Sequence, residues 1–240
     1  MVMPFVLFLL TGTTLIGLTL MEKEAQAASV FIADEGSGTV TIVDVAIDLI
    51  AHAVKYRIAV DRGPHGLRLS PDARTIAVAS TIGRSVSLIG VATGVESRRI
   101  YVGRRPSHVA FTPEGNTLLV SLNGEDRIAI VDVGTAKLVD KVGVGHGPMQ
   151  VSVTPDGGTA VVANPGSTAR PDDRVSVIDL RTAAASHVRG GAGAHGVAIQ
   201  GRNGYVTNMH ADALTVLDIE KRRGVRSFKT GRRPNGLAVR

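Results

Sequence analysis

The sequence predicts an all-β fold made of repeated four-stranded units, and three observations support this prediction. A Pro-containing phrase recurs every 42 residues, as GPHGLRLSPDARTIAVAS from Gly63, RPSHVAFTPEGNTLLVSL from Arg105 and GPMQVSVTPDGGTAVVAN from Gly147. A second phrase, rich in alternating β-branched residues, lies between these copies, as expected for short strands. No stretch of the repeat region sustains the period of about 3.6 residues that marks an amphipathic helix.

Each repeat unit holds four short strands, here called A to D from the Pro-containing strand outward. Ser-Pro-Asp or Thr-Pro-Glu-Gly forms the turn from strand A to strand B, because Pro presets φ and Asp or Gly suits the turn positions that follow. Strand C is the second phrase. It reads TVTIVDVA from Thr39, SVSLIGVA from Ser85, RIAIVDVG from Arg127, RVSVIDLR from Arg174 and ALTVLDIE from Ala213.

Four-stranded units at this spacing are typical of β-propeller blades. After residue 27 the chain begins with strands B, C and D of one unit, and four full units follow. The first of these opens at Gly63 and the last, GAHGVAIQGRNGYVTNMH, at Gly193. The chain then ends with a single A strand at residues 235–239, which we expect to complete the first unit. This count predicts five blades closed by the C-terminal strand, with no open edge. The alternative is a fragment of a seven-bladed ring.

The N-terminal segment is separate from the repeats. Residues 2–21 are apolar apart from Thr and Gly, and Ala25-Gln26-Ala27 matches the small-x-small site of signal peptidase. We therefore predict a signal peptide at 1–27 and a propeller domain at 28–240, exported to the periplasm or secreted. No Lys or Arg precedes the apolar stretch, so an uncleaved membrane anchor is the alternative.

Composition argues against several classes of function. The chain has no Cys, hence no disulfide, no thiolate metal site and no c-type haem attachment motif. It has no Trp and only three Tyr, so stacking platforms for nucleic acid are scarce, and no nucleic-acid partner is expected. The net charge of +6 favours acidic partners.

The repeat resembles the YVTN family of β-propellers. Tyr205-Val206-Thr207-Asn208 spells the family signature at a B strand, and the Ser/Thr-Pro-Asp/Glu and Val-x-Val/Ile-Ile/Val-Asp phrases are similar to it as well. The resemblance covers nearly everything after residue 29. It implies a periplasmic or cell-surface protein, distantly like lactonases and the haem-carrying propellers of nitrite reductases. Gly90 in place of Asp, and IQGRN in place of SPDG, depart from the pattern.

The propeller register places the D–A and B–C loops together on one face, around the mouth of the channel. We name this the His/Arg face, because five of the seven His residues and many Arg residues fall on it. The candidate ligand-binding residues are Arg62, His65, Arg104, Arg105, His108, His146, His195, His210, Arg232 and Arg233. Arg84, Asp126 and Arg170 lie in the B–C loops of the same face. Guanidinium groups suit carboxylate and phosphate, so the face is expected to bind an acidic ligand.

Other polar residues have a structural interpretation. The inner-strand histidines can ligate a metal, but hydrogen bonds to a neighbouring blade are the favoured prediction. Asp at the end of strand C is expected to accept backbone N–H bonds at Asp44, Asp132, Asp179 and Asp218. The long B–C loop at 164–173 carries Asp172 and Asp173, which are too few oxygen ligands to define a cation site. No metal site and no catalytic residue is therefore predicted.

Three functions remain open from the sequence. The first is a non-enzymatic propeller that binds a small acidic ligand or a protein on the His/Arg face. The second is a carrier or assembly factor for a haem-like macrocycle, although no residue requires a cofactor. The third is a lactonase-type hydrolase, which is disfavoured because the inner strands GLRL, HVAF, QVSV, GVAI and GLAV contain no carboxylate.

The predicted export has a direct test. N-terminal sequencing of the protein from periplasm or culture medium is expected to start near Ala28, because cleavage follows Ala27. Recovery of chains that start at Met1, in the membrane fraction, would instead establish an uncleaved anchor.

Overall fold

The structure is a computed structural model that describes residues 28–34, 38–45, 53–167 and 169–239. The predicted signal peptide at 1–27 lies outside these residues. In the described part no helix is long and apolar enough to cross a bilayer.

The described residues form 19 strands in five antiparallel sheets, and five sheets are what the repeat predicts. The first sheet has three strands, β1 (Ala28–Asp34), β2 (Thr39–Val45) and β3 (Ala53–Ala59). The second has β4 (Pro64–Leu69), β5 (Thr75–Ser80), β6 (Ser85–Gly90) and β7 (Val95–Tyr101). The third has β8 (Pro106–Phe111), β9 (Thr117–Leu122), β10 (Arg127–Asp132) and β11 (Lys137–Gly143). The fourth has β12 (Val151–Val153), β13 (Thr159–Ala163), β14 (Arg174–Asp179) and β15 (Ala184–Arg189). The fifth has β16 (Ala194–Gln200), β17 (Asn203–Asn208), β18 (Ala213–Asp218) and β19 (Arg223–Lys229).

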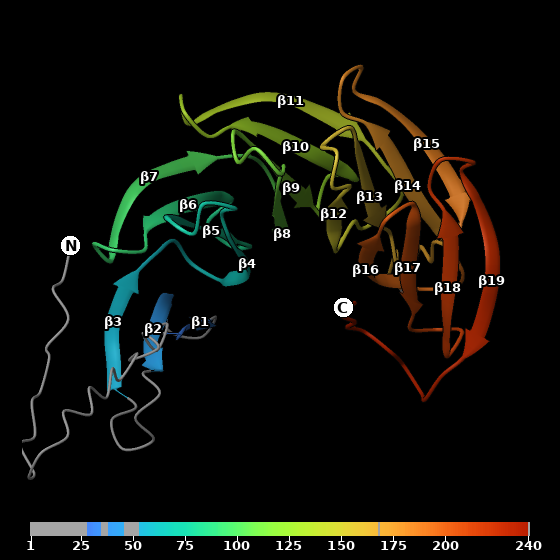
Figure 1. Ribbon diagram of the computed structural model, residues 1–240, viewed down its shortest axis with the longest axis horizontal. Helices are drawn as coiled ribbons and strands as arrows, with labels where there is room; N and C mark the ends of the chain where they lie inside the picture. The colour runs from blue at the N-terminus through green and yellow to red at the C-terminus, as the bar shows by residue number, and fades with distance from the viewer. Residues whose placement is uncertain (1–27, 35–37, 46–52, 168, 240) are drawn as a thin grey trace, which may run out of the picture.

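Each sheet is a meander of sequential strands, so the four-stranded blade predicted from the repeat is confirmed. Figure 1 shows the sheets arranged in an arc, with β4, β8, β12 and β16 on its inner side. Neighbouring inner strands are in contact: β1 with β4, β4 with β8, β8 with β12, and β12 with β16. The fold is thus an all-β assembly of propeller-type blades.

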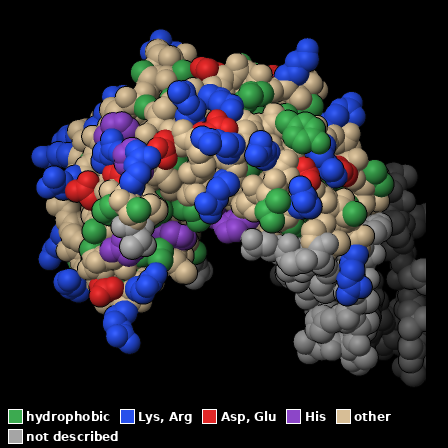
Figure 2. Space-filling view, turned by 180° about the vertical axis from the view of Figure 1, so that it is seen from behind, with side chains coloured by type: hydrophobic (Ala, Val, Ile, Leu, Met, Phe, Trp, Pro, Cys, Tyr) green, Lys and Arg blue, Asp and Glu red, His purple; other side chains and the backbone are tan. Residues whose placement is uncertain are grey.

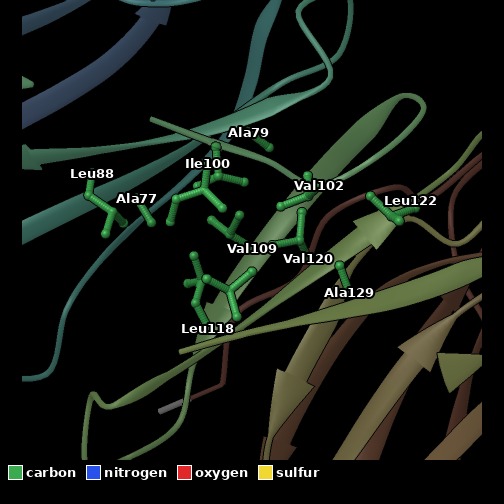
Figure 3. Close-up of a cluster of buried hydrophobic side chains, with 12 residues drawn as sticks. Ala77, Ala79, Leu88, Ile100, Val102, Val109, Leu118, Val120, Leu122 and Ala129 are labelled. Atoms are coloured by element: carbon green, nitrogen blue, oxygen red, sulfur yellow. The ribbon is translucent and has the colours of Figure 1, made fainter. Parts of the chain in front are cut away.

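The hydrophobic core lies between the blades, and the middle strands feed it on both of their faces. Leu118, Val120 and Leu122 of β9 pack toward the second sheet (Figure 3), whereas Leu119 packs toward the fourth. Because strand side chains alternate, an apolar run such as TLLVSL supplies two separate clusters. Each such fully buried Leu contributes about 2 kcal/mol of transfer free energy, so the blades stabilise one another.

The C-terminal segment differs from the predicted closing strand. Residues 234–239 form no strand, and no ladder joins them to β1 in the described residues. Instead His195 of β16 is hydrogen-bonded to the Asn235 carbonyl, at 2.9 Å. Figure 1 shows the segment beside β16 and apart from β1. The segment thus lies against β16 in the position where the inner strand of a next blade would pack. It does not pair with β1, so the first sheet has three strands and the ring is not closed through this segment.

The recurring turn residues act as predicted. Asp132 Oδ1 accepts the Thr135 backbone N–H at 2.7 Å, and Asp179 Oδ1 accepts the Thr182 N–H at 3.0 Å. Asp218 Oδ1 likewise accepts the Lys221 N–H, also at 3.0 Å. The side chain of Asp44 lies outside the described side chains. These carboxylates therefore close the C–D turns, as the sequence indicated.

The inner strands approach so closely that side chains are excluded at Gly66. A Cβ built on Gly66 would lie 2.7 Å from the His108 Cα and would also meet the Ser107 carbonyl of the next blade. At Gly143, by contrast, an added Cβ would meet nothing within 4 Å. Glycine at position 66 is thus required by contact between blades.

This difference predicts the effect of two matched substitutions. Gly66→Ala should lower the free energy of unfolding by about 2 kcal/mol or more, because backbone of β8 must move to admit the methyl group. Gly143→Ala should change it by less than about 0.5 kcal/mol. Urea denaturation of both variants measures the difference. Equal stability of the two would show that β4 and β8 are not in close contact in solution.

Candidate functional site

The D–A and B–C loops lie side by side, which supports the predicted His/Arg face. The Thr81 N–H donates to the Gly63 carbonyl at 2.7 Å, and the Asn123 N–H donates to the Arg105 carbonyl at 3.0 Å. The Met209 N–H repeats the contact at 2.9 Å from the Gly193 carbonyl. Each pair joins the loop that enters a blade to the B–C loop of that blade. In each of these three blades the entering loop and the B–C loop are therefore held together at one end of the sheet.

A pocket of about 650 Å³ opens on this face, between the second and third sheets. Its cationic lining comes from Arg84, Arg104 and Arg105, and His65 also lines it. The remaining walls contain polar and apolar groups but no carboxylate: Thr81, Ile82, Ser107, Asn123, Gly124 and Met149. The volume is in the range of small-molecule sites.

A second, smaller pocket of about 330 Å³ adjoins the first, and the two share Arg104, Arg105, Asn123 and Gly124. In this pocket His146 Nδ1 lies 2.9 Å from Asp126 Oδ2. Arg170, from the long B–C loop, lies over the His146 ring with Nη2 3.0 Å from Nε2. The Arg104–Arg105 pair thus forms a cationic ridge between two hollows.

The carboxylates of this face are already engaged. Glu125 accepts the Arg104 N–H at 2.6 Å and the Lys141 ammonium at 2.8 Å. Asp61 accepts the Ser85 hydroxyl at 2.7 Å. Burial opposes ionisation of Glu125, Asp61 and Asp126, but hydrogen bonds and nearby cations outweigh it, so the pKa of each lies below its usual value. These acids remain ionised and are held in place by their partners.

The guanidinium groups of the larger pocket lack such partners. In the described part of the chain no ion pair joins Arg84, Arg104 or Arg105 to a carboxylate. All three side chains are exposed. Figure 2 shows one face of the molecule, on which Lys and Arg outnumber acidic side chains and His side chains lie beside the central hollow. The pocket is therefore electropositive and open to a ligand.

The backbone at Arg105 is in the left-handed region, with φ of 50°. The matching position before strand A is glycine in three other blades: Gly63, Gly147 and Gly193, all with positive φ. A non-glycine residue costs about 1 kcal/mol in this conformation. Arg105→Gly would therefore remove a charge from the pocket while relieving backbone strain.

The histidines of the inner strands join neighbouring segments, as the sequence predicted. His65 Nδ1 lies 3.1 Å from the Ser107 carbonyl of the next blade, and His195 Nδ1 makes the matching bond to the Asn235 carbonyl. A carbonyl only accepts, so Nδ1 carries the proton in both rings.

His108 occupies a different environment from these two rings. It is half-buried and packs edge-on against His65, with ring centroids 5.3 Å apart. Burial, with smaller contributions from His65, Arg68 and His195, lowers its pKa to about 4. Its ring is therefore neutral at physiological pH.

The structure divides the predicted ligand residues into groups. His65, Arg104 and Arg105 line the larger pocket, and His146 lines the smaller one. The remaining candidates line neither pocket: Arg62, His108, His195, His210, Arg232 and Arg233. Asn123 and Met149 also line the larger pocket but were not among the residues predicted from the sequence. The repeat pattern could have found them, because Asn123 begins a B–C loop and Met149 follows the Pro that opens strand A.

The long B–C loop is organised around a buried carboxylate, that of Asp172, which pairs with the half-buried Arg174. Asp172 is 6% exposed, accepts the His146 N–H at 2.6 Å and lies 2.7 Å from the Arg174 guanidinium. Asp173 pairs with Arg189 at 3.1 Å. Across the described residues, no group of three His, Cys, Asp or Glu has the arrangement of a metal site. Asp172 thus anchors the loop to the D–A rim.

Comparison with known proteins supports the fold class. No protein-family model matches the sequence, and no curated protein matches it. The fold is similar to Kuenenia stuttgartiensis hydrazine synthase, with a TM-score of 0.58 and 18% sequence identity over 87% of this chain and 85% of that chain. In all, 1300 chains of solved structures match. The chain is a protein of the β-propeller class. At 18% identity this similarity supports only the fold and gives no information on activity.

The lowered pKa of His108 predicts a pH dependence of stability. The unfolded chain binds this proton near pH 6.5 and the folded chain only near pH 4, so stability falls as the pH drops through that window. His108→Gln, which copies Gln150 of the next blade, should remove this loss. When the pH is lowered from about 7.5 to about 4.5, the free energy of unfolding should fall by about 2 kcal/mol more in the native protein than in the variant, measured by urea denaturation. Identical pH profiles would contradict the burial of His108.

Proposed function

We propose that the protein is an exported YVTN-type propeller that binds a small acidic ligand, without transforming it, in the 650 Å³ pocket of the His/Arg face. The observation that carries the proposal is the set of three exposed guanidinium groups, of Arg84, Arg104 and Arg105, in a pocket whose lining contains no carboxylate.

The chemistry of the lining favours a small anion. Guanidinium groups bind carboxylate or phosphate through paired N–H donors, and three of them share one concave site. Asn123 and Ser107 add polar groups, while Ile82 and Met149 offer apolar contact to the body of a ligand. Glu125 accepts the Arg104 backbone N–H and the Lys141 ammonium, and Asp61 accepts the Ser85 hydroxyl. In the described residues neither carboxylate forms an ion pair with these guanidinium groups. A concave pocket of this size favours a small molecule over a protein partner.

Export and family membership complete the proposal. The Ala25-Gln26-Ala27 site supports secretion, and the Tyr205–Asn208 signature supports a YVTN-type repeat. The signature residues have structural partners: Thr207 Oγ1 accepts the Gly196 N–H at 2.9 Å, and Asn208 Nδ2 donates to Thr215 Oγ1 at 2.8 Å. The signature residues therefore stabilise the blade, and we assign ligand binding to the loops.

Two arginines with the same backbone provide a matched test. Arg105 and Arg222 both have φ of 50°, but Arg222 lies in the C–D turn of the fifth sheet, on the opposite face. Each substitution to Gly removes one charge and relieves the same strain. With citrate as the probe, calorimetric titration should show about tenfold weaker binding for Arg105→Gly and little change for Arg222→Gly.

Salt provides a further readout of the same site. Citrate binding to the native protein should weaken as ionic strength rises, because exposed charges are screened. Arg84→Gln should reduce affinity in the same way as Arg105→Gly. Equal losses from Arg105→Gly and Arg222→Gly, or no citrate binding to either face, would refute the proposed pocket.

A further inference from the structure

A third cavity, of about 340 Å³, lies at the centre of the arc, and we name it the central cavity. Its walls come from β4, β8, β12, β16 and the C-terminal segment 234–239. No lining residue is shared with the two pockets of the His/Arg face. The central cavity is therefore a separate site, independent of the function proposed above.

Most of the residues that line the central cavity are apolar. Leu69 of the second sheet and Val239 of the C-terminal segment are each 40% exposed although both side chains are large and hydrophobic. Phe111, Val153 and Ile199 complete the apolar surface. Apolar area left in contact with water is favourable for covering by a hydrocarbon group.

One charged side chain lines this cavity. Arg68 of β4 is exposed, and in the described residues no ion pair engages it. The lining contains no carboxylate. The other two polar side chains each bond to β16, because Gln150 Oε1 accepts the Val197 N–H at 2.8 Å and Ser152 Oγ donates to the Val197 carbonyl at 2.9 Å. Arg68 is thus the cation available to a ligand.

We propose that the central cavity binds a small free amphiphilic carboxylate. The hydrocarbon body lies among Leu69, Phe111 and Val153, and the carboxylate accepts hydrogen bonds from the Arg68 guanidinium. A cavity lined mostly by apolar residues, with one cation in its wall, suits a molecule that carries a hydrocarbon chain and one negative charge. The volume is at the lower end of small-molecule sites, which restricts the ligand to a short chain.

Three probes of equal chain length separate the charge from the chain: octanoate, octanol and octylamine. Calorimetric titration of the native protein should show octanoate binding about tenfold more tightly than octanol, because only the carboxylate gains charge-assisted hydrogen bonds. Arg68→Gln should remove this preference and leave octanol binding unchanged. Arg223→Gln, on the exposed outer strand β19, is the matched control and should have no effect.

A charge introduced at the rim gives a second, independent variant. Leu69 is 40% exposed, so Leu69→Asp should fold, which circular dichroism verifies. The new carboxylate should lower the affinity for octanoate and raise the affinity for octylamine. Octylamine should then bind more tightly than octanoate, the reverse of the order in the native protein. Unchanged octanoate affinity in Arg68→Gln would overturn the proposal. So would a loss of octanoate binding in Arg105→Gly but not in Arg68→Gln, because the probe would then occupy the His/Arg face. Failure of citrate to bind leaves these outcomes unaffected.

Discussion

The structure depends on packing between blades, because no strand ladder crosses from one sheet to the next in the described residues. Each hydrogen-bonded unit is complete within about 40 residues, yet the middle strands β5, β9 and β13 bury apolar side chains on both faces. A blade alone would leave both faces in water, so stability comes from stacking, as in other repeat folds. The clusters around Leu118 and Leu119 show how one strand serves two interfaces.

Close contact at the inner strands follows from this packing. Gly66 and Gly196 have no room for a side chain, and His65 and His195 reach across to carbonyl groups of the next inner segment. Gln150, which directly precedes β12, likewise links its blade to β16, because its side-chain oxygen accepts a hydrogen bond from the Val197 N–H. These polar bonds replace the ladder that is absent between blades, and they fix the spacing of the loops above them.

The electropositive pocket is a consequence of how the loops satisfy their own backbone. Exposed D–A N–H groups recruit nearby carboxylates, such as Glu125 for Arg104 and Asp172 for His146. Lys141 and Arg174 then neutralise those acids. In the described residues the guanidinium groups of the pocket form no ion pair with a carboxylate, so positive charge concentrates there even though acidic residues lie within the same loops. In contrast, the central cavity holds the single cation Arg68 among apolar walls.

The sequence by itself determined the four-stranded blade and the order of its strands. The reason is that a strict repeat encodes local information, with turn residues such as Asp132 and alternating strands such as residues 117–122 specifying each blade independently. It did not determine which cations share a pocket, since that depends on distances between loops 20 or more residues apart: Arg84 joined the site, while Arg233 did not. The path of the C-terminal segment was also decided only by tertiary structure. The repeat pattern predicted that the segment pairs with β1, but the His195–Asn235 hydrogen bond places it against β16.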